Sequence, residues 1–396
     1  MMNYSNRVWP EFKLWEQFAS DVLIPSLQVI DALKIGSKLK LAFNLQLDAL
    51  ENSHPVKVAV NNPREIDEVF DKISYRKGAS LIRMLHSVMG EDAFRAGMRG
   101  YMTTYAYSNA TTSQLWACLS KALPNFDVAE LMNCWVDNVG FPILKVSLLR
   151  RPDQPLALQV TQERFSAAHK CNEGLVWKVP LLVCVQGEQG DPVTLPLTVL
   201  TERSTELVFP SELSLDLERG CYVKMNPGFR SYYRTDYSRE LAGALERGMA
   251  ACSIPPVDRL STLEDRVSLV LGEQGNTVAL MGLIGRLDKE DSFGVWKNLS
   301  SFFHVLRCIV WSSEKLASQF DKFVVGAMLP CLERIGWSRA AEESHLTSML
   351  RGLLICQLGT RGCRLVEQRC AGLFHSWVVE GTDVEPGLRE VVSNSY

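Results

Sequence analysis

The residues that most often bind metals or act as general bases are few in this chain and widely spaced. No two of its histidines are four residues apart; they are His54, His86, His169, His304, His345 and His375. The H-E-x-x-H arrangement, which places two imidazoles and a glutamate on one helical face, is therefore absent. Ligands could converge from distant segments, but an isolated histidine on a helix is more often a packed or surface residue. We predict no metal ligand within residues 1–396.

Nucleophilic catalysis has no specific signature either. The chain contains no G-x-S-x-G turn and no glycine-rich phosphate-binding loop. Its 11 cysteines are dispersed without a C-x-x-C pair, as is typical of buried thiols in a reducing compartment. Residue counts alone do not exclude a Cys–His pair as the nucleophile, although so many thiols make any single one a weak candidate. These residues alone predict no more than a three-part α/β/α protein.

One segment carries a more specific pattern. Residues 62–85, NPREIDEVFDKISYRKGASLIRML, resemble the part of the gluzincin-type zinc aminopeptidases in which a D-x-I-x-Y-x-K-G stretch leads into a long helix. The resemblance extends along most of the chain, through WPEFKLWEQFAS from Trp9, LENSHP from Leu50, WVDNVGFPILKV from Trp135, VKMNPGFRSYYRTDYS from Val223, IPPVDRLSTLEDRVSLV from Ile254 and HLTSMLRGLLICQLG from His345. On these motifs the chain resembles the C-terminal part of that family, and most of all its puromycin-sensitive branch.

This resemblance implies a role for one tyrosine, because the family's catalytic tyrosine falls on Tyr75. A phenol O–H held over the scissile carbonyl would donate to the oxyanion that develops as zinc-bound water attacks. The plainer alternative is a tyrosine packed at a helix start, and the motif favours the catalytic ancestry. Lys77 and Gly78 are expected to be structural, with the lysine on the surface and the glycine permitting a close approach.

Neighbouring polar residues have plainer explanations. Asp67, Glu68 and Asp71 invite an interpretation as paired catalytic carboxylates. A solvated acidic turn or a helix cap explains them as well, and we favour that explanation. His54 precedes a proline in a predicted loop near the cleft, and we treat it as structural.

Two departures from the family pattern decide the predicted function. Residues 1–396 lack the G-x-M-E-N motif that binds the substrate's free amine and the H-E-x-x-H motif with its more distant glutamate. The zinc of the full-length relatives therefore has no ligands in this chain, and the chain alone is expected to be inactive. Val29–Gln46 also interrupts the pattern, with LQVIDAL nearly repeated as LQLDAL. A local duplication or an untranslated segment read through in the gene would each leave this mark.

Composition limits the partners of the chain. A net charge of -3 supplies no overall basic field, so we expect neither nucleic acid nor anionic membrane as a partner. No apolar run reaches the roughly 18 residues of a membrane-spanning helix. The first residues, Met1 to Trp9, show no signal peptide, so a cytoplasmic location is expected. Peptides are the partner that the resemblance implies for the full-length relatives.

Hydrophobic spacing predicts the elements that would position Tyr75. Leu81, Met84, Leu85 and Val88 form one stripe of a helix that begins near Lys77. A second helix is expected after the polar cluster of residues 109–113. Gly and Pro within residues 135–142 predict that the helical part ends there.

Beyond residue 142 the spacing changes twice. Apolar residues alternate in 144–148, 156–160 and 179–185, which indicates strands of a small β-sandwich. After Asp236 the pattern is helical again, and Ser261 to Glu264 has the spacing of a capping box at a helix start. Further helices are expected over residues 293–310, 313–335 and 345–358, in an α-solenoid that is only partly built.

The predicted fold class is therefore multidomain α+β. Residues 1–142 would be the helical remnant of a thermolysin-like catalytic domain, 143–235 the β-sandwich and 236–396 the partial C-terminal helical domain. The resemblance implies a fragment of a metalloaminopeptidase that removes N-terminal residues from peptides. Two alternatives stay open: a non-catalytic module that binds peptides or proteins, and a chain that joins a separately encoded N-terminal half.

Overall fold

The structure, a computed structural model, describes residues 48, 53–65, 71, 73–166, 174–188, 190–211, 213, 215–340, 342–385, 388–389 and 392–393. Its residues form two compact units. The mixed unit comprises the described residues up to Leu245 together with Leu271–Gln274, and the helical unit comprises Glu246–Val270 and the described residues from Gly275 onward. The interruption predicted at Val29–Gln46 and the motif that begins at Trp9 lie outside the described residues.

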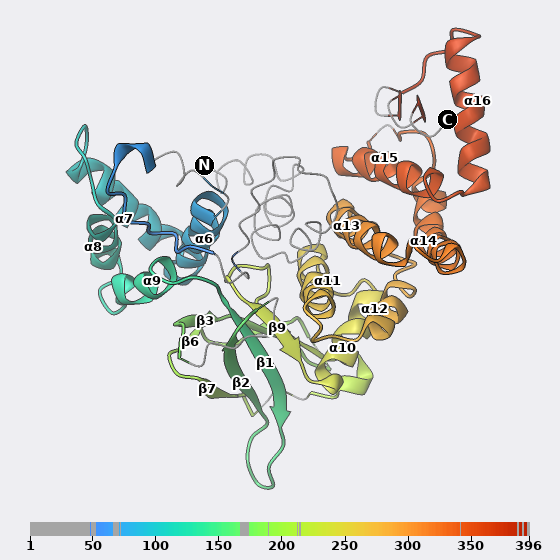
Figure 1. The fold of residues 1–396 in the computed structure, drawn as a ribbon. Helices are drawn as coiled ribbons and strands as arrows, with labels where there is room; N and C mark the ends of the chain where they lie inside the picture. Colours follow the sequence, from blue (N-terminus) through green and yellow to red (C-terminus); the bar gives the residue numbers. More distant parts are fainter. Residues whose placement is uncertain are drawn as a thin grey trace. The chain divides into compact units, whose positions relative to one another are not determined.

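The helical part of the mixed unit contains Tyr75, and its helices α6 to α9 lie together in Figure 1. It consists of the 3-10 turn η4 (Pro63–Glu65), the π-helical turn η5 (Ile73–Lys77), α6 (Gly78–Met89), α7 (Glu91–Thr104), α8 (Thr112–Ala122) and α9 (Val128–Val136). The predicted stripe of α6 is buried at Leu81, Met84 and Leu85. The predicted start of α8 is confirmed, because the Thr111 hydroxyl accepts from the Gln114 amide while the Gln114 side chain accepts from the Thr111 amide.

The β part of the mixed unit contains β1 (Pro142–Leu149), β2 (Ala157–Arg164), β3 (Val179–Leu181), β4 (Val183–Gln186), β5 (Val193–Thr194), β6 (Thr198–Leu200), β7 (Ser204–Val208), β8 (Tyr222–Met225) and β9 (Arg234–Tyr237), with the 3-10 turn η6 (Leu217–Arg219) before β8. Three sheets have the orders β7-β2-β1-β9, β5-β4-β8 and β3-β6. The long β1–β2 hairpin pairs Pro142 with Arg164, and β9 adds parallel to β1. Figure 1 shows β1, β2 and β9 side by side.

An aromatic cluster connects α9 to these strands. Trp135 of α9 lies 6.2 Å from both Trp177 and Tyr232, measured between ring centroids. Phe141 stacks on Phe165 at 5.4 Å. All five rings are fully buried, so the segment after Val136 is held by the same core as the sheets. This core fixes the chain where α9 gives way to β1, close to the turn that carries Tyr75.

The helical unit is a succession of packed helices. They are α11 (Pro256–Leu271), α12 (Thr277–Ile284), α13 (Phe293–Val310), α14 (Glu314–Ile335), α15 (His345–Gly359) and α16 (Arg364–Val378), preceded by α10 (Arg239–Ala250), in which the division between the units falls. The bounds of α13, α14 and α15 confirm the predicted helices to within one residue. The described residues thus have a mixed α and β fold, as the sequence predicts.

Two local predictions about these elements are wrong. Ser261 and Glu264 do not start a helix: α11 begins at Pro256, and both residues are buried within it. Proline suits the first helical position because its missing N–H would have no partner there. The predicted strand over residues 179–185 is divided between β3 and β4, which belong to different sheets.

Candidate functional site

Tyr75 lies in the middle of the π-helical turn η5, directly before α6. Its neighbours at the ends of the turn, Ile73 and Lys77, are 3% and 0% exposed, whereas Tyr75 is 62% exposed. Single π-helical turns within helices are frequent at functional sites. Here the turn buries its two ends and leaves the Tyr75 side chain at the surface.

Asp71 holds the start of this turn. Its Oδ1 accepts a hydrogen bond from the Ser74 amide at 2.8 Å, and its backbone carbonyl accepts from the Tyr75 amide at 3.2 Å. A carboxylate that accepts from the first free amides of a helical segment acts as an N-cap. Asp71 therefore behaves as a cap, the explanation favoured from the sequence. Its predicted companions Asp67 and Glu68 lie outside the described residues.

His54 braces the same carboxylate. Its Nε2 lies 2.6 Å from Asp71 Oδ2, and its Nδ1 lies 2.7 Å from the carbonyl oxygen of Pro55. Burial alone would lower the pKa of His54, but the hydrogen bonds with Pro55 and Asp71 and the charges of Asp71 and Asp48 raise that pKa above its ordinary value. Because both neighbouring atoms are acceptors, only the imidazolium donates to both. His54 is structural, as expected, and it acts through Asp71 on the turn of Tyr75.

Lys77 is not on the surface, and the prediction that placed it there is wrong. Its Nζ forms an ion pair with Asp48 Oδ2 at 2.9 Å, and the two side chains are 0% and 1% exposed. The same Nζ donates to the carbonyl oxygens of Asn138 at 3.1 Å and Gly140 at 2.9 Å. A buried ammonium needs this many partners because its desolvation is costly. Lys77 therefore fixes the C-terminal end of η5.

Asp48 is satisfied in turn by groups from other parts of the mixed unit. Its Oδ1 accepts from the Gly140 amide at 2.8 Å, and its Oδ2 lies 3.5 Å from the Tyr232 hydroxyl. The network thus joins residue 48, the η5 turn and the segment between α9 and β1. Sequence analysis missed Asp48, since an aspartate 29 residues before its partner leaves no local pattern.

Helix α6, which continues from the turn, is anchored at Arg83 and not at Gly78. A Cβ added at Gly78 would meet nothing closer than Val56 Cγ1 at 3.9 Å, an ordinary contact, so the expected close approach at this glycine is wrong. Arg83 instead anchors the helix, because its Nη2 donates to the Gly228 carbonyl at 2.9 Å. Burial is the main reason why the pKa of Arg83 falls to about 10.

The described residues do not form a zinc site. They contain no group of three His, Cys, Asp or Glu side chains that could hold a metal ion. His86 pairs with Glu91 at 3.1 Å and His304 lies 3.8 Å from Cys308, while His169 lies outside the described residues. No helix of the described residues is both long enough and apolar enough to cross a membrane.

Comparisons with known proteins agree with the motif that contains Tyr75. The Peptidase family M1 domain matches residues 4–135, and the ERAP1-like C-terminal domain matches residues 222–395. Tyr75, Asp71, His54 and Lys77 all fall in the first of these ranges. The chain belongs to peptidase family M1.

Individual M1 relatives match the chain along most of its length. It is 31% identical over 382 residues to the puromycin-sensitive aminopeptidase of Caenorhabditis elegans, covering 96% of this chain and 37% of that protein. Aminopeptidase M1 of Arabidopsis thaliana is 30% identical over 90% of this chain and 38% of its own length. The alanine/arginine aminopeptidase of Saccharomyces cerevisiae is 29% identical over 98% and 41%. The chain thus spans well under half the length of these relatives.

Proposed function

We propose that residues 1–396 form the C-terminal part of a zinc aminopeptidase that removes N-terminal residues from peptides, and that Tyr75 stabilises the oxyanion of the reaction. The observation that carries this proposal is the exposed side chain of Tyr75 on a turn whose two ends are buried. Membership of family M1 and the names of the relatives support an aminopeptidase.

The residues of this chain would hold a hydrogen-bond donor in place. When a peptide carbonyl is attacked, negative charge develops on its oxygen, and a phenol O–H fixed above it donates to that charge. One such donor is typically worth roughly 3 kcal/mol of transition-state stabilisation. The Asp71 cap before Tyr75 and the Lys77–Asp48 pair after it restrict the turn, so less ordering would be needed at the moment of reaction.

We further propose that the chain alone does not hydrolyse peptides. In a full-length enzyme a bound zinc would supply the activated water, and residues 1–396 contain neither the H-E-x-x-H motif that would hold it nor the G-x-M-E-N motif. We also propose that residues 1–142 form a thermolysin-like helical remnant, residues 143–235 a β-sandwich and residues 236–396 a partial solenoid, and that the protein is cytoplasmic.

The test is a measurement of zinc and of hydrolysis in two proteins. The purified 396-residue chain should contain less than about 0.1 equivalent of zinc and should release no product from alanyl-p-nitroanilide. A polypeptide that joins these residues to the part of the C. elegans relative outside the match should bind zinc and release p-nitroaniline. One equivalent of zinc with turnover in the chain alone would contradict the proposed inactivity. A joined protein that binds peptides without cleaving them would favour the non-catalytic binding module instead.

A further inference from the structure

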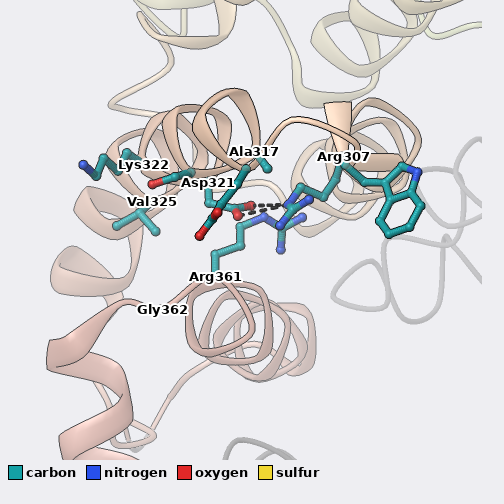
Figure 2. A pocket seen from close by; sticks show the side chains of 10 residues that line it. Arg307, Ala317, Asp321, Lys322, Val325, Arg361 and Gly362 are labelled. Carbon is teal, nitrogen blue, oxygen red and sulfur yellow. Dashed lines mark hydrogen bonds and ion pairs between the residues drawn. The ribbon is translucent and has the colours of Figure 1, made fainter. Parts of the chain in front are cut away.

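The helical unit contains a cavity of about 500 Å³ that the proposed chemistry does not use. Its walls come from the C-terminal turns of α13, the first turns of α14 and the turn between α15 and α16. The charged side chains that line it are Arg307, Glu314, Asp321, Lys322 and Arg361, and Trp311 lies at its border with 73% of its side chain exposed. Figure 2 shows Arg307 and Arg361 reaching toward Asp321 from separate segments of the chain, with Lys322 directed away from them.

Arg307 uses only part of its guanidinium. Its Nε donates to both carboxylate oxygens of Asp321, each at 3.0 Å. Its two terminal amino groups form no hydrogen bond with any described residue. A guanidinium carries five N–H donors in a planar fork, so four donors of Arg307 are left for water or a ligand.

Arg361 also uses only part of its guanidinium, and it forms no ion pair with a described carboxylate. Its Nη1 donates to the carbonyl oxygen of Gln357 at 3.0 Å and to the Gln357 side-chain oxygen at 2.6 Å. Its Nε is buried and has no hydrogen-bond partner among the described residues. The pKa of Arg361 is lowered overall. Burial is the main cause and the charge of Arg307 adds to it, while the charge of Asp321 acts in the opposite direction. Arg361 thus carries a partly desolvated charge without a carboxylate in contact, which is a costly state.

The charges that line the cavity do not cancel. The lining contains three cations, Arg307, Lys322 and Arg361, and two carboxylates, Glu314 and Asp321. Asp321 forms an ion pair with Arg307, and it acts on Arg361 only through its charge. Glu314 is the first residue of α14, where the partial positive charge of the helix N-terminus offsets its own charge. An anion that entered between Arg307 and Arg361 would meet unused N–H donors and a surplus of positive charge.

We propose that this cavity binds the oxyanion group of a small molecule, held between the guanidiniums of Arg307 and Arg361. Guanidinium forks match carboxylate and phosphate oxygens, and such charge-assisted hydrogen bonds are about twice as strong as neutral ones. The exposed indole of Trp311 at the border would cover an apolar or aromatic part of the same ligand. The cavity volume falls within the range typical of small-molecule sites.

The experiment uses the full 396-residue chain and isothermal titration calorimetry at constant ionic strength in chloride. Inorganic phosphate and benzoate are the two probes. At least one of them should bind saturably at a single site, and Arg307→Gln and Arg361→Gln should each weaken that binding about tenfold or more. Lys315→Gln is the matched control: this exposed lysine on α14 does not line the cavity, and its loss should change binding less than about twofold.

Each result decides the question. Saturable binding of phosphate alone assigns a phosphorylated ligand, and binding of benzoate alone assigns a carboxylate. In each case the site is supported when the Arg307 and Arg361 variants weaken that binding. Absence of saturable binding for both probes overturns it, as does an equal loss in Lys315→Gln, which would show nonspecific counterion binding. If circular dichroism shows that Arg361→Gln does not fold, Arg361→Lys and Arg307→Lys take its place. These keep the charge without the fork and should still weaken binding severalfold.

Discussion

The turn that carries Tyr75 and the cavity that contains Arg361 treat their polar groups in opposite ways. Around Tyr75, both nitrogens of His54 have acceptors, Asp71 accepts from the turn, and Lys77 has three partners. In the cavity, Arg307 and Arg361 keep N–H groups that bond to no described residue. The first arrangement fixes a side chain in place, whereas the second leaves binding capacity for a partner from outside.

The largest loss of stability is expected when a cation with a full set of partners in the chain, Lys77, is removed. Lys77→Met leaves Asp48 buried without its counter-charge, and the loss of a partner from a buried ion pair typically costs about 3–5 kcal/mol. The free energy of opening of α6, measured by amide hydrogen exchange with mass spectrometry, should fall by about that amount. Lys57→Met is the control, because the Lys57–Asp137 pair is exposed and should contribute less than about 1 kcal/mol. Equal losses in the two variants would contradict a structural role for the buried pair.

A smaller effect is expected at the His54 brace, and it should depend on pH. The folded pKa of His54 is raised, so its stabilising contribution is fully present below the unfolded pKa and is lost as pH rises through the raised folded value. The charged groups that act on it are Asp71 and Asp48. His54→Gln should therefore weaken protection of the η5 amides by on the order of 1 kcal/mol near pH 5.5, and by less near pH 9.

The measurement for His54 is hydrogen exchange across a pH series, corrected for the intrinsic exchange rate. His375→Gln serves as the control, since His375 is 65% exposed and lies 4.0 Å from Glu380. A difference between the native chain and His54→Gln that stays constant or grows with rising pH would rule out the protonated brace.

The smallest loss of stability is expected at Arg361, whose Nε has no hydrogen-bond partner among the described residues. Arg361→Met removes a partly desolvated charge, which is stabilising, and two hydrogen bonds to Gln357, which is destabilising. The two effects should nearly offset, so the free energy of unfolding of the helical unit, measured by denaturant melting, should change by less than about 1 kcal/mol. Arg351→Met gives the contrast in the same unit: Arg351 is 1% exposed and pairs with Glu343, which is 6% exposed. Its loss should cost about 3–5 kcal/mol. A comparable loss at Arg361 would mean that this guanidinium is already satisfied within the chain.

The sequence predicts features that depend on nearby residues. The stripe of α6, the cap of α8 and the bounds of α13 to α15 follow from spacing and capping chemistry within a few residues, and the structure confirms them. The Tyr75 motif is equally local, and the matched M1 range contains it. Gly78 shows the limit of such arguments, because its place in a motif does not reveal that the space around it is open.

Features that depend on distant partners could not be predicted in this way. The surface position expected for Lys77 is wrong because its partners Asp48, Asn138 and Gly140 come from other parts of the chain. The pairing of Arg307 with Asp321 and the orphaned Nε of Arg361 likewise depend on how α13, α14 and α15 pack. Ser261 differs, because the proline at the start of α11 was a local signal that outweighs the capping-box spacing.

The most direct test of the proposed role of Tyr75 is the kinetic effect of removing its hydroxyl group. In the polypeptide that joins these residues to the part of the C. elegans relative outside the match, Tyr75→Phe should lower kcat by about 10²- to 10³-fold while KM changes less than about threefold. Tyr107→Phe, at a fully exposed tyrosine outside the turn, should leave kcat unchanged. A Tyr75→Phe protein that keeps kcat within about threefold of the parent would contradict the assignment of Tyr75 as the oxyanion donor.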